Sequence, residues 1–218
     1  CTSLKSVSIG SGCTSISTTA FLADKALETI TVSADNTAYK SVDNVIYSKD
    51  GKQLVLYPKS KEGAFVVPDT VTTINEYAFQ NCDKLTEVTI GKNVATIGNY
   101  SFYNCDKLTK VTIKDNADVA KTIGYQAFYN CLVLAEVDFG NNVTSIDNYA
   151  FYSCYELKSL VFPATLKTIG YYAFAYIDKL TSVKFTGNAL TSIGSQAFYD
   201  CDGITELSIT GNNATIGS

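Results

Sequence analysis

The chain is 218 residues long, 46% of its residues are apolar, and its formal net charge at pH 7 is -4. All 17 basic residues are lysines scattered along the sequence, so there is no basic stripe to neutralise phosphates, which argues against a nucleic-acid partner. No apolar run reaches the roughly 18 residues that a membrane-spanning helix needs. We therefore expect no direct membrane insertion by this segment.

Histidine and arginine are both missing from the sequence. Histidine is the usual proton carrier near neutral pH. Without these two residue types, Ser-His and Cys-His nucleophile pairs, His-based zinc sites and bidentate arginine clamps are excluded within this segment. We expect a non-catalytic chain that uses no metal and no cofactor.

Internal repetition is the dominant pattern of the sequence. Ala-Phe or Ser-Phe pairs recur with gaps of 58, 23, 26, 23, 23 and 24 residues, at Phe21, Phe79, Phe102, Phe128, Phe151, Phe174 and Phe198. Around each phenylalanine the same apolar frame returns, as in Leu85-x-x-Val88-x-Ile90. Alternation of apolar and polar residues predicts one short, half-buried strand in each unit. After the strand, an Ile-Gly step predicts a turn, and the short segment 99–104 has room only for a helical or 3₁₀ turn.

The first unit begins within the repeat frame, because Cys1-Thr-Ser-Leu4 matches the sequence that leads into Leu85. The last one stops after Ile216-Gly217, halfway through a unit. The pattern therefore predicts a single repeat domain over residues 1–218, truncated at both ends within repeats. The signal and anchor of the whole protein would then lie outside this fragment.

Leu27 and Leu85, which begin the apolar frame in two recognisable units, are 58 residues apart. The stretch between them contains one further coil, which we call the disguised coil, and an insert at 36–62. In the disguised coil, the apolar frame is kept by Phe65, Val67, Val71 and Ile74. In the insert, two apolar runs, 45–47 and 54–57, flank a turn at Asp50-Gly51 and predict a β-hairpin that projects from the repeats. A structural spacer is favoured over a binding arm for this hairpin.

The repeat frame resembles the BspA-like, treponemal-type leucine-rich repeat, which carries the same Leu, Ile-Gly and Ala-Phe-x-x-Cys landmarks. The resemblance covers essentially the whole chain. It implies a leucine-rich-repeat solenoid, a right-handed superhelix whose strands pair in a parallel ladder. Members of this family share surface display and interaction with hosts, other cells or matrix, so it also implies an extracellular or cell-surface location.

Cysteines recur at one position of the frame, three residues before the leading apolar residue. They are Cys1, Cys82, Cys105, Cys131, Cys154 and Cys201. The same position holds Ile177 in one unit and Asp24 in another, which favours free, buried, inert thiols. Disulfides or a metal site are the alternatives, because neighbouring coils would bring these residues within bridging distance.

Two surfaces are candidates for binding. Tyrosines directly follow the core phenylalanine in several units, and stacking would turn them into an aromatic stripe: Tyr103, Tyr129, Tyr152 and Tyr199. A second stripe, Tyr100, Tyr149 and Tyr172, precedes the phenylalanine by two residues. Packing between coils is the alternative role for these rings. The outward strand positions form the second candidate surface, with Glu87, Thr89, Lys110, Thr112, Glu136 and Asp138, although an ordinary solvated sheet would look the same.

These observations predict a non-catalytic scaffold or adhesin that binds a protein or glycan on a host, matrix or neighbouring cell surface. The competing hypothesis is a structural spacer that displays a distal functional domain. An enzyme would require a catalytic domain elsewhere in a longer protein.

Overall fold

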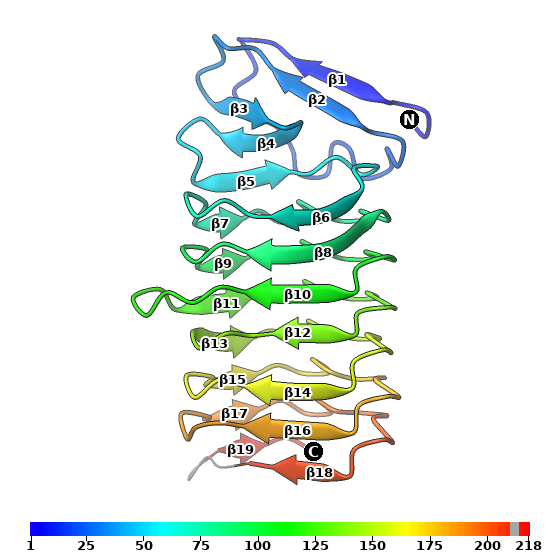
Figure 1. Ribbon diagram of the computed structural model, residues 1–218, viewed down its shortest axis with the longest axis vertical. Coiled ribbons are helices and arrows are strands. Elements are labelled where there is room, and N and C mark those ends of the chain that lie inside the picture. The colour runs from blue at the N-terminus through cyan, green and yellow to red at the C-terminus, as the bar shows by residue number, and fades with distance from the viewer. Residues whose placement is uncertain (210–213) are drawn as a thin grey trace.

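The chain forms a right-handed solenoid of about nine turns with parallel strands, drawn with its axis vertical in Figure 1. The computed structural model describes residues 1–209 and 214–218. Successive coils stack along the axis because one coil cannot bury its own apolar side chains. The leucine-rich-repeat solenoid that the repeat pattern predicts is confirmed.

The strands form two ladders along the axis, besides a two-stranded parallel sheet at the N-terminal end, β1 (Ser6–Ile9) and β2 (Thr29–Val32). The strand face carries β6 (Gly63–Val66), β8 (Leu85–Ile90), β10 (Lys110–Ile113), β12 (Glu136–Asp138), β14 (Ser159–Phe162), β16 (Ser182–Phe185) and β18 (Glu206–Ser208). The short-strand face carries β3 (Tyr39–Val42), β4 (Val45–Ser48), β5 (Gln53–Leu56), β7 (Thr73–Ile74), β9 (Thr96–Ile97), β11 (Lys121–Ile123), β13 (Val143–Ile146), β15 (Thr168–Ile169), β17 (Ser192–Ile193) and β19 (Thr215–Ile216).

The register of the ladders places equivalent residues of successive coils side by side. Val88 lies opposite Val111, which in turn lies opposite Val137. The disguised coil obeys the same register, since Phe65 lies opposite Val88. Inside, the core phenylalanines stack as a column, with ring centroids 4.5 to 5.6 Å apart from Phe79 to Phe198. A one-residue slip would bring these side chains to the surface, so the apolar frame fixes the register.

The third side of the solenoid, the turn face, joins each short strand to the next long strand. The helical or 3₁₀ turns expected there are absent from the described residues. The N–H groups of Tyr100, Phe102 and Asn104 donate to carbonyls of the next coil, whereas those of Ser101 and Tyr103 close turns within their own coil. Tyr100 and Asn104 adopt φ angles of 54° and 55°, which a right-handed helix excludes. This alternation gives the turn face its own ladder of hydrogen bonds between coils.

The insert also differs in part from the prediction. The hairpin exists, because β4 pairs antiparallel with β5, and Gly51 has the positive φ that its turn requires. Its strands do not project, however: β5 pairs with β7 and extends the ladder of the short-strand face, and β3 adds a further antiparallel strand. Burial explains this placement, since Val45 and Leu54 join the main core while Ile46 and Val55 join a separate N-terminal core.

The ladder of the strand face is interrupted once. No hydrogen-bonded pairing joins β12 to β14 among the described residues, so the seven long strands form one sheet of four and one of three. Figure 1 shows β12 and β14 further apart than the neighbouring pairs of this face. The other two sides remain paired at this level, because β13 pairs with β15 and the turn face keeps its bonds.

Candidate binding surfaces

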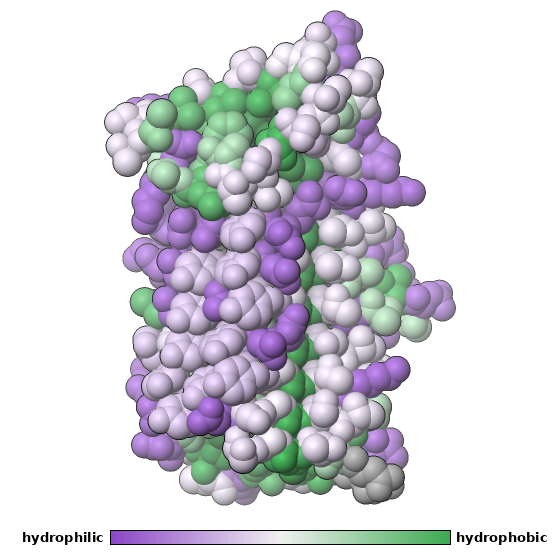
Figure 2. Space-filling view, turned by 180° about the vertical axis from the view of Figure 1, so that it is seen from behind, coloured by the Kyte–Doolittle hydropathy of each residue, from purple (hydrophilic) through white to green (hydrophobic). Residues whose placement is uncertain are grey.

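The turn face carries a continuous network of tyrosine rings, which we call the tyrosine network. Its members are Tyr77, Tyr100, Tyr103, Tyr125, Tyr129, Tyr149, Tyr152, Tyr171, Tyr172, Tyr176 and Tyr199. Figure 2 views this side of the molecule, where large, weakly hydrophilic side chains gather along the axis beside a narrow hydrophobic column. The predicted stripes therefore come together on one surface.

The ladder of hydrogen bonds sets the spacing of these rings. Tyr129 stacks between Tyr103 and Tyr152, with centroids 5.1 and 4.8 Å apart and interplanar angles of 6° and 2°. Rings stacked in this way cover each other's faces, so the packing role is present. The network is nevertheless partly exposed, and Tyr199 and Tyr171 keep 44% and 37% of their surface accessible.

At two of the repeat positions that lack the expected tyrosine, a neighbouring tyrosine takes its place. Where Gln126 replaces it, Tyr125 bridges Tyr100 and Tyr149 through edge-on contacts with interplanar angles of 76° and 78°. Where Ala175 replaces it, Tyr176 takes over in the same way between Tyr152 and Tyr199. Sequence reasoning missed Tyr125 and Tyr176, although each lies one residue from a frame position without tyrosine, Gln126 and Ala175. It also missed Tyr77 and Tyr171.

Burial raises the pKa of several phenols of the network above the ordinary value for tyrosine. Burial raises the pKa of Tyr152 to about 12, and the neighbouring Tyr129 adds to the shift. Burial, with a hydrogen bond to Tyr171, also raises the pKa of Tyr172 to about 12. At neutral pH the surface therefore presents uncharged hydroxyls and aromatic carbon, which is the chemistry of many protein and glycan interfaces.

The predicted residues of the strand face also come together, in two rows across neighbouring strands. Lys110 lies between Glu87 and Glu136 and forms an ion pair with Glu136 at 2.8 Å. In the second row, Thr112 lies between Thr89 and Asp138. The two rows therefore form a solvated surface on which charged and hydroxyl side chains alternate. Exposed ion pairs of this kind add little to stability.

Shallow grooves lie on both strand-bearing sides. One of about 550 Å³ lies over the interruption between β12 and β14, and its lining includes Asp138, Phe139 and Val161. Another of about 560 Å³ runs over the short-strand face and is lined mainly by threonines, asparagines and glycines. Neither groove contains a cluster of metal-ligating side chains in the part of the chain that the structure describes.

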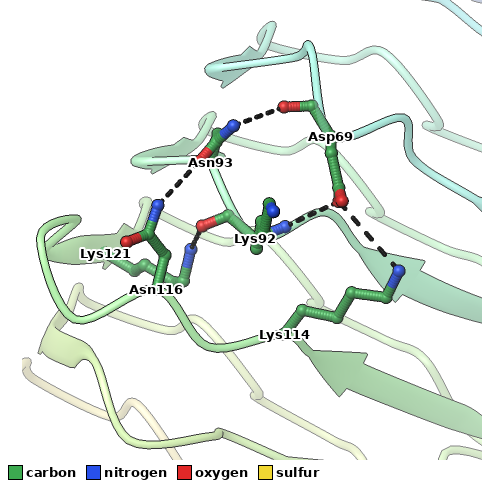
Figure 3. Close-up of polar contacts among 6 residues, drawn as sticks. All are labelled: Asp69, Lys92, Asn93, Lys114, Asn116 and Lys121. Atoms are coloured by element: carbon green, nitrogen blue, oxygen red, sulfur yellow. Dashed lines mark hydrogen bonds and ion pairs between the residues drawn. The ribbon is translucent and has the colours of Figure 1, made fainter.

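A buried lysine stabilises the coil of β11, which has three residues more than its 23-residue neighbours. Lys121 is 1% exposed, and its Nζ donates to the carbonyls of Lys92 at 2.6 Å and Val94 at 2.9 Å. Figure 3 shows this contact beside a chain of amides in which Asn116 donates to Asn93, which donates to the Asp69 carbonyl. The lysine satisfies carbonyls that this irregular coil leaves without regular partners.

The cysteines of the repeat frame are free, and Cys1 alone among them is exposed. The thiols of Cys105, Cys131, Cys154 and Cys201 each donate to a core phenylalanine carbonyl of an earlier coil, at 3.0 to 3.2 Å. Burial raises the pKa of every buried thiol in the ladder, for example that of Cys201 to about 11. The prediction of free and buried thiols is confirmed for five of the six positions.

The chain matches the family model described as BspA type leucine rich repeat region, in six copies over residues 1–48, 57–121 and 117–218. The chain therefore belongs to this family of leucine-rich repeat proteins. No curated protein matches it at a significant level. The described residues include no helix that could cross a membrane.

Solved structures agree with this assignment. A leucine-rich repeat protein from Eubacterium ventriosum is 26% identical with a TM-score of 0.86, covering 99% of this chain and 57% of its own. A leucine rich cell surface protein from Faecalibacterium prausnitzii is 30% identical with a TM-score of 0.75, covering 85% of this chain and 49% of its own. The pneumococcal vaccine antigen PcpA, at 23% identity and a TM-score of 0.61, shares the fold. The chain spans about half the length of the first two proteins.

Proposed function

We propose that this chain is a non-catalytic scaffold displayed at the bacterial cell surface, and that it binds a protein or glycan of a host, matrix or neighbouring cell. The observation that carries the proposal is the tyrosine network, which offers a broad, rigid and uncharged aromatic surface along the turn face. A cell-surface location is supported by the similarity to the Faecalibacterium prausnitzii cell surface protein.

The rigidity of the tyrosine network favours binding over a passive spacer role. Ordering an exposed side chain at an interface has an entropic cost, and the rings in this network are already held by their neighbours. Tyr129, for example, lies between two parallel rings less than 5.2 Å away. Tyrosine also supplies a large contact area with only two rotatable side-chain bonds, which suits adaptable recognition of macromolecules.

Binding of the purified chain to a panel of extracellular matrix proteins and surface glycans tests the proposal. We expect a saturable ligand, and we expect the triple change Tyr103→Ala, Tyr129→Ala and Tyr152→Ala to weaken it by about tenfold or more, as hot-spot aromatics do. The matched control is Glu87→Ala, Lys110→Ala and Glu136→Ala on the strand face, which should change affinity less than about twofold.

Two results would contradict this assignment. Loss of binding in the strand-face control but not in the tyrosine variant would move the site to the other surface. Absence of any saturable ligand across the panel would favour the spacer hypothesis. The corresponding Tyr→Phe changes keep the stacked rings, so they provide a folded comparison if the alanine variant is unstable.

A further inference from the structure

The interruption of the strand face coincides with missing backbone hydrogen bonds at two positions of one coil. At the start of the long strand, the N–H groups of Thr109, Ala135, Thr181 and Thr205 each donate to a carbonyl of the preceding coil, at 2.8 to 3.1 Å. Lys158 occupies this position at the interruption, and no such bond joins it to Ala135 in the described chain. Thr109, Thr181 and Thr205 add a hydroxyl bond to the same carbonyl, which a lysine cannot form.

At the other end of the strand a proline removes a second donor. Lys114 and Thr186 occupy the equivalent position in other coils, and their N–H groups donate to Ile90 and Phe162 at 3.1 and 3.0 Å. Pro163 has no N–H, so the Phe139 carbonyl of the preceding coil receives no such bond. We call the opening between residues 136–140 and 158–163 the strand-face gap.

The groove over the strand-face gap is chemically suited to a cation. Asp115 and Asp138 line it together with Phe139, whose carbonyl has no ladder donor. The Asp115 carboxylate accepts from the Asn141 N–H and side-chain amide, and that of Asp138 accepts from the Gly140 N–H, so each brings a negative charge with some acceptor capacity left. Lys114 also belongs to the lining, but its ammonium group lies 4.0 Å from Asp69, and Figure 3 shows it reaching toward the preceding coils. Lys184, which lies beside Val161 on β16, does not line the groove.

The same molecule shows how an irregular coil is normally stabilised. In the coil of β11, the Lys121 ammonium group donates to two backbone carbonyls. Lys59, which is also 1% exposed, donates in the same way to the Gln80 carbonyl. No side chain of the described residues donates to the Phe139 carbonyl.

We propose that the strand-face gap binds a basic side chain, lysine or arginine, from a polypeptide partner. The charged head is held by Asp138, Asp115 and the Phe139 carbonyl. The aliphatic stem packs on Val161, which is 54% exposed beside the groove, as stems of basic residues do on apolar surface. The groove volume of about 550 Å³ exceeds that of one side chain and leaves room for the flanking backbone. This site is separate from the tyrosine network.

The experiment is a titration of the isotope-labelled chain with blocked tripeptides, followed through its backbone amide resonances. The probes are acetyl-Ala-Arg-Ala-amide and acetyl-Ala-Lys-Ala-amide, and acetyl-Ala-Gln-Ala-amide is the neutral control. We expect the basic peptides to shift the amides of Asp138, Gly140 and Val161 with a Kd on the order of 1 mM. The neutral peptide should leave them unchanged.

A closing variant gives the decisive comparison. Lys158→Thr with Pro163→Thr supplies the residues that the next coil uses, so it should restore the ladder and weaken binding by about tenfold or more. Pro68→Thr, a change of the matching proline at the free edge of β6, should leave binding unchanged. Asp138→Asn keeps the acceptor for the Gly140 N–H and removes the charge, so it tests the cation requirement even if the closing variant does not fold.

Unchanged binding in both the closing variant and Asp138→Asn would overturn the proposal. Equal binding of the neutral peptide would also overturn it, because recognition would then rest on peptide backbone alone. A neutral hexasaccharide that shifts the same amides in place of the basic peptides would assign the gap to a glycan and equally refute it. The tyrosine variants leave this site intact, so its failure and the failure of the proposed function are distinguishable.

Discussion

The turn face and the strand face are built from the same coils, yet they tolerate sequence change differently. On the turn face, substitution of a network tyrosine by Gln126 or Ala175 is compensated by a neighbouring ring, and the hydrogen bonds between coils continue. On the strand face, the bonds to the preceding coil are missing at Lys158 and Pro163 among the described residues, and the sheet divides there. The difference indicates that a solenoid can lose pairing on one side while the other sides hold the stack together.

The largest effect on the free energy of unfolding should come from the column of core phenylalanines, which lies behind both faces. Phe128 is fully buried and stacks between Phe102 and Phe151 with centroids 4.8 and 4.9 Å away. Phe128→Ala should lower the free energy of unfolding by about 3–5 kcal/mol, measured by urea denaturation, because it leaves a cavity in a column that cannot collapse locally. Val161→Ala, on the exposed strand face, is the control and should cost less than about 0.5 kcal/mol. Similar losses for the two variants would contradict the division between core and surface.

The core was predictable because its frame repeats, whereas the surfaces depend on details that a frame does not contain. The recurring apolar residues predicted one short strand in each unit and the disguised coil at Phe65 to Ile74. The turn face was predicted as helical because local spacing does not reveal that alternate N–H groups bond to the next coil. The hairpin was expected to project because the sequence alone does not show that Leu54 and Val45 are buried against the first regular coil.

The candidate binding surfaces were only partly predictable from the sequence. The stripes of Tyr103, Tyr129 and Tyr152 followed from the repeat, but the bridging role of Tyr125 required the positions of neighbouring rings. The strand-face gap could not be predicted from the sequence. A proline such as Pro163 is common in turns, and only the structure shows that its position faces the Phe139 carbonyl of the preceding coil.

A smaller effect on stability should come from ionisation of the tyrosine network at high pH. An unfolded tyrosine ionises near pH 10, and burial raises the pKa of Tyr152 to about 12 in the folded chain. A raised pKa favours the neutral phenol in the folded state, so this contribution to stability is complete below about pH 10 and is lost as the pH rises toward about 12. Urea midpoints measured across this interval should fall more steeply for the parent chain than for Tyr152→Phe. Buried cysteines add a loss of the same sign to both proteins, so equal slopes would contradict the role of the phenol.

The smallest effect lies at the strand-face gap itself and can be measured without any ligand. The Lys158 N–H lacks the ladder acceptor that Thr181, its equivalent in the next coil, has in the Lys158 carbonyl at 2.9 Å. Hydrogen exchange, corrected for intrinsic rates, should therefore be faster at Lys158 than at Thr181 by about tenfold or more. At the same level of the stack, the Phe151 N–H donates across the turn face to Ala173 at 2.7 Å and should remain as protected as Phe128. Fast exchange at both Lys158 and Phe151 would mean that the whole coil opens, whereas fast exchange at Lys158 alone would place the opening on the side where Pro163 removes a donor.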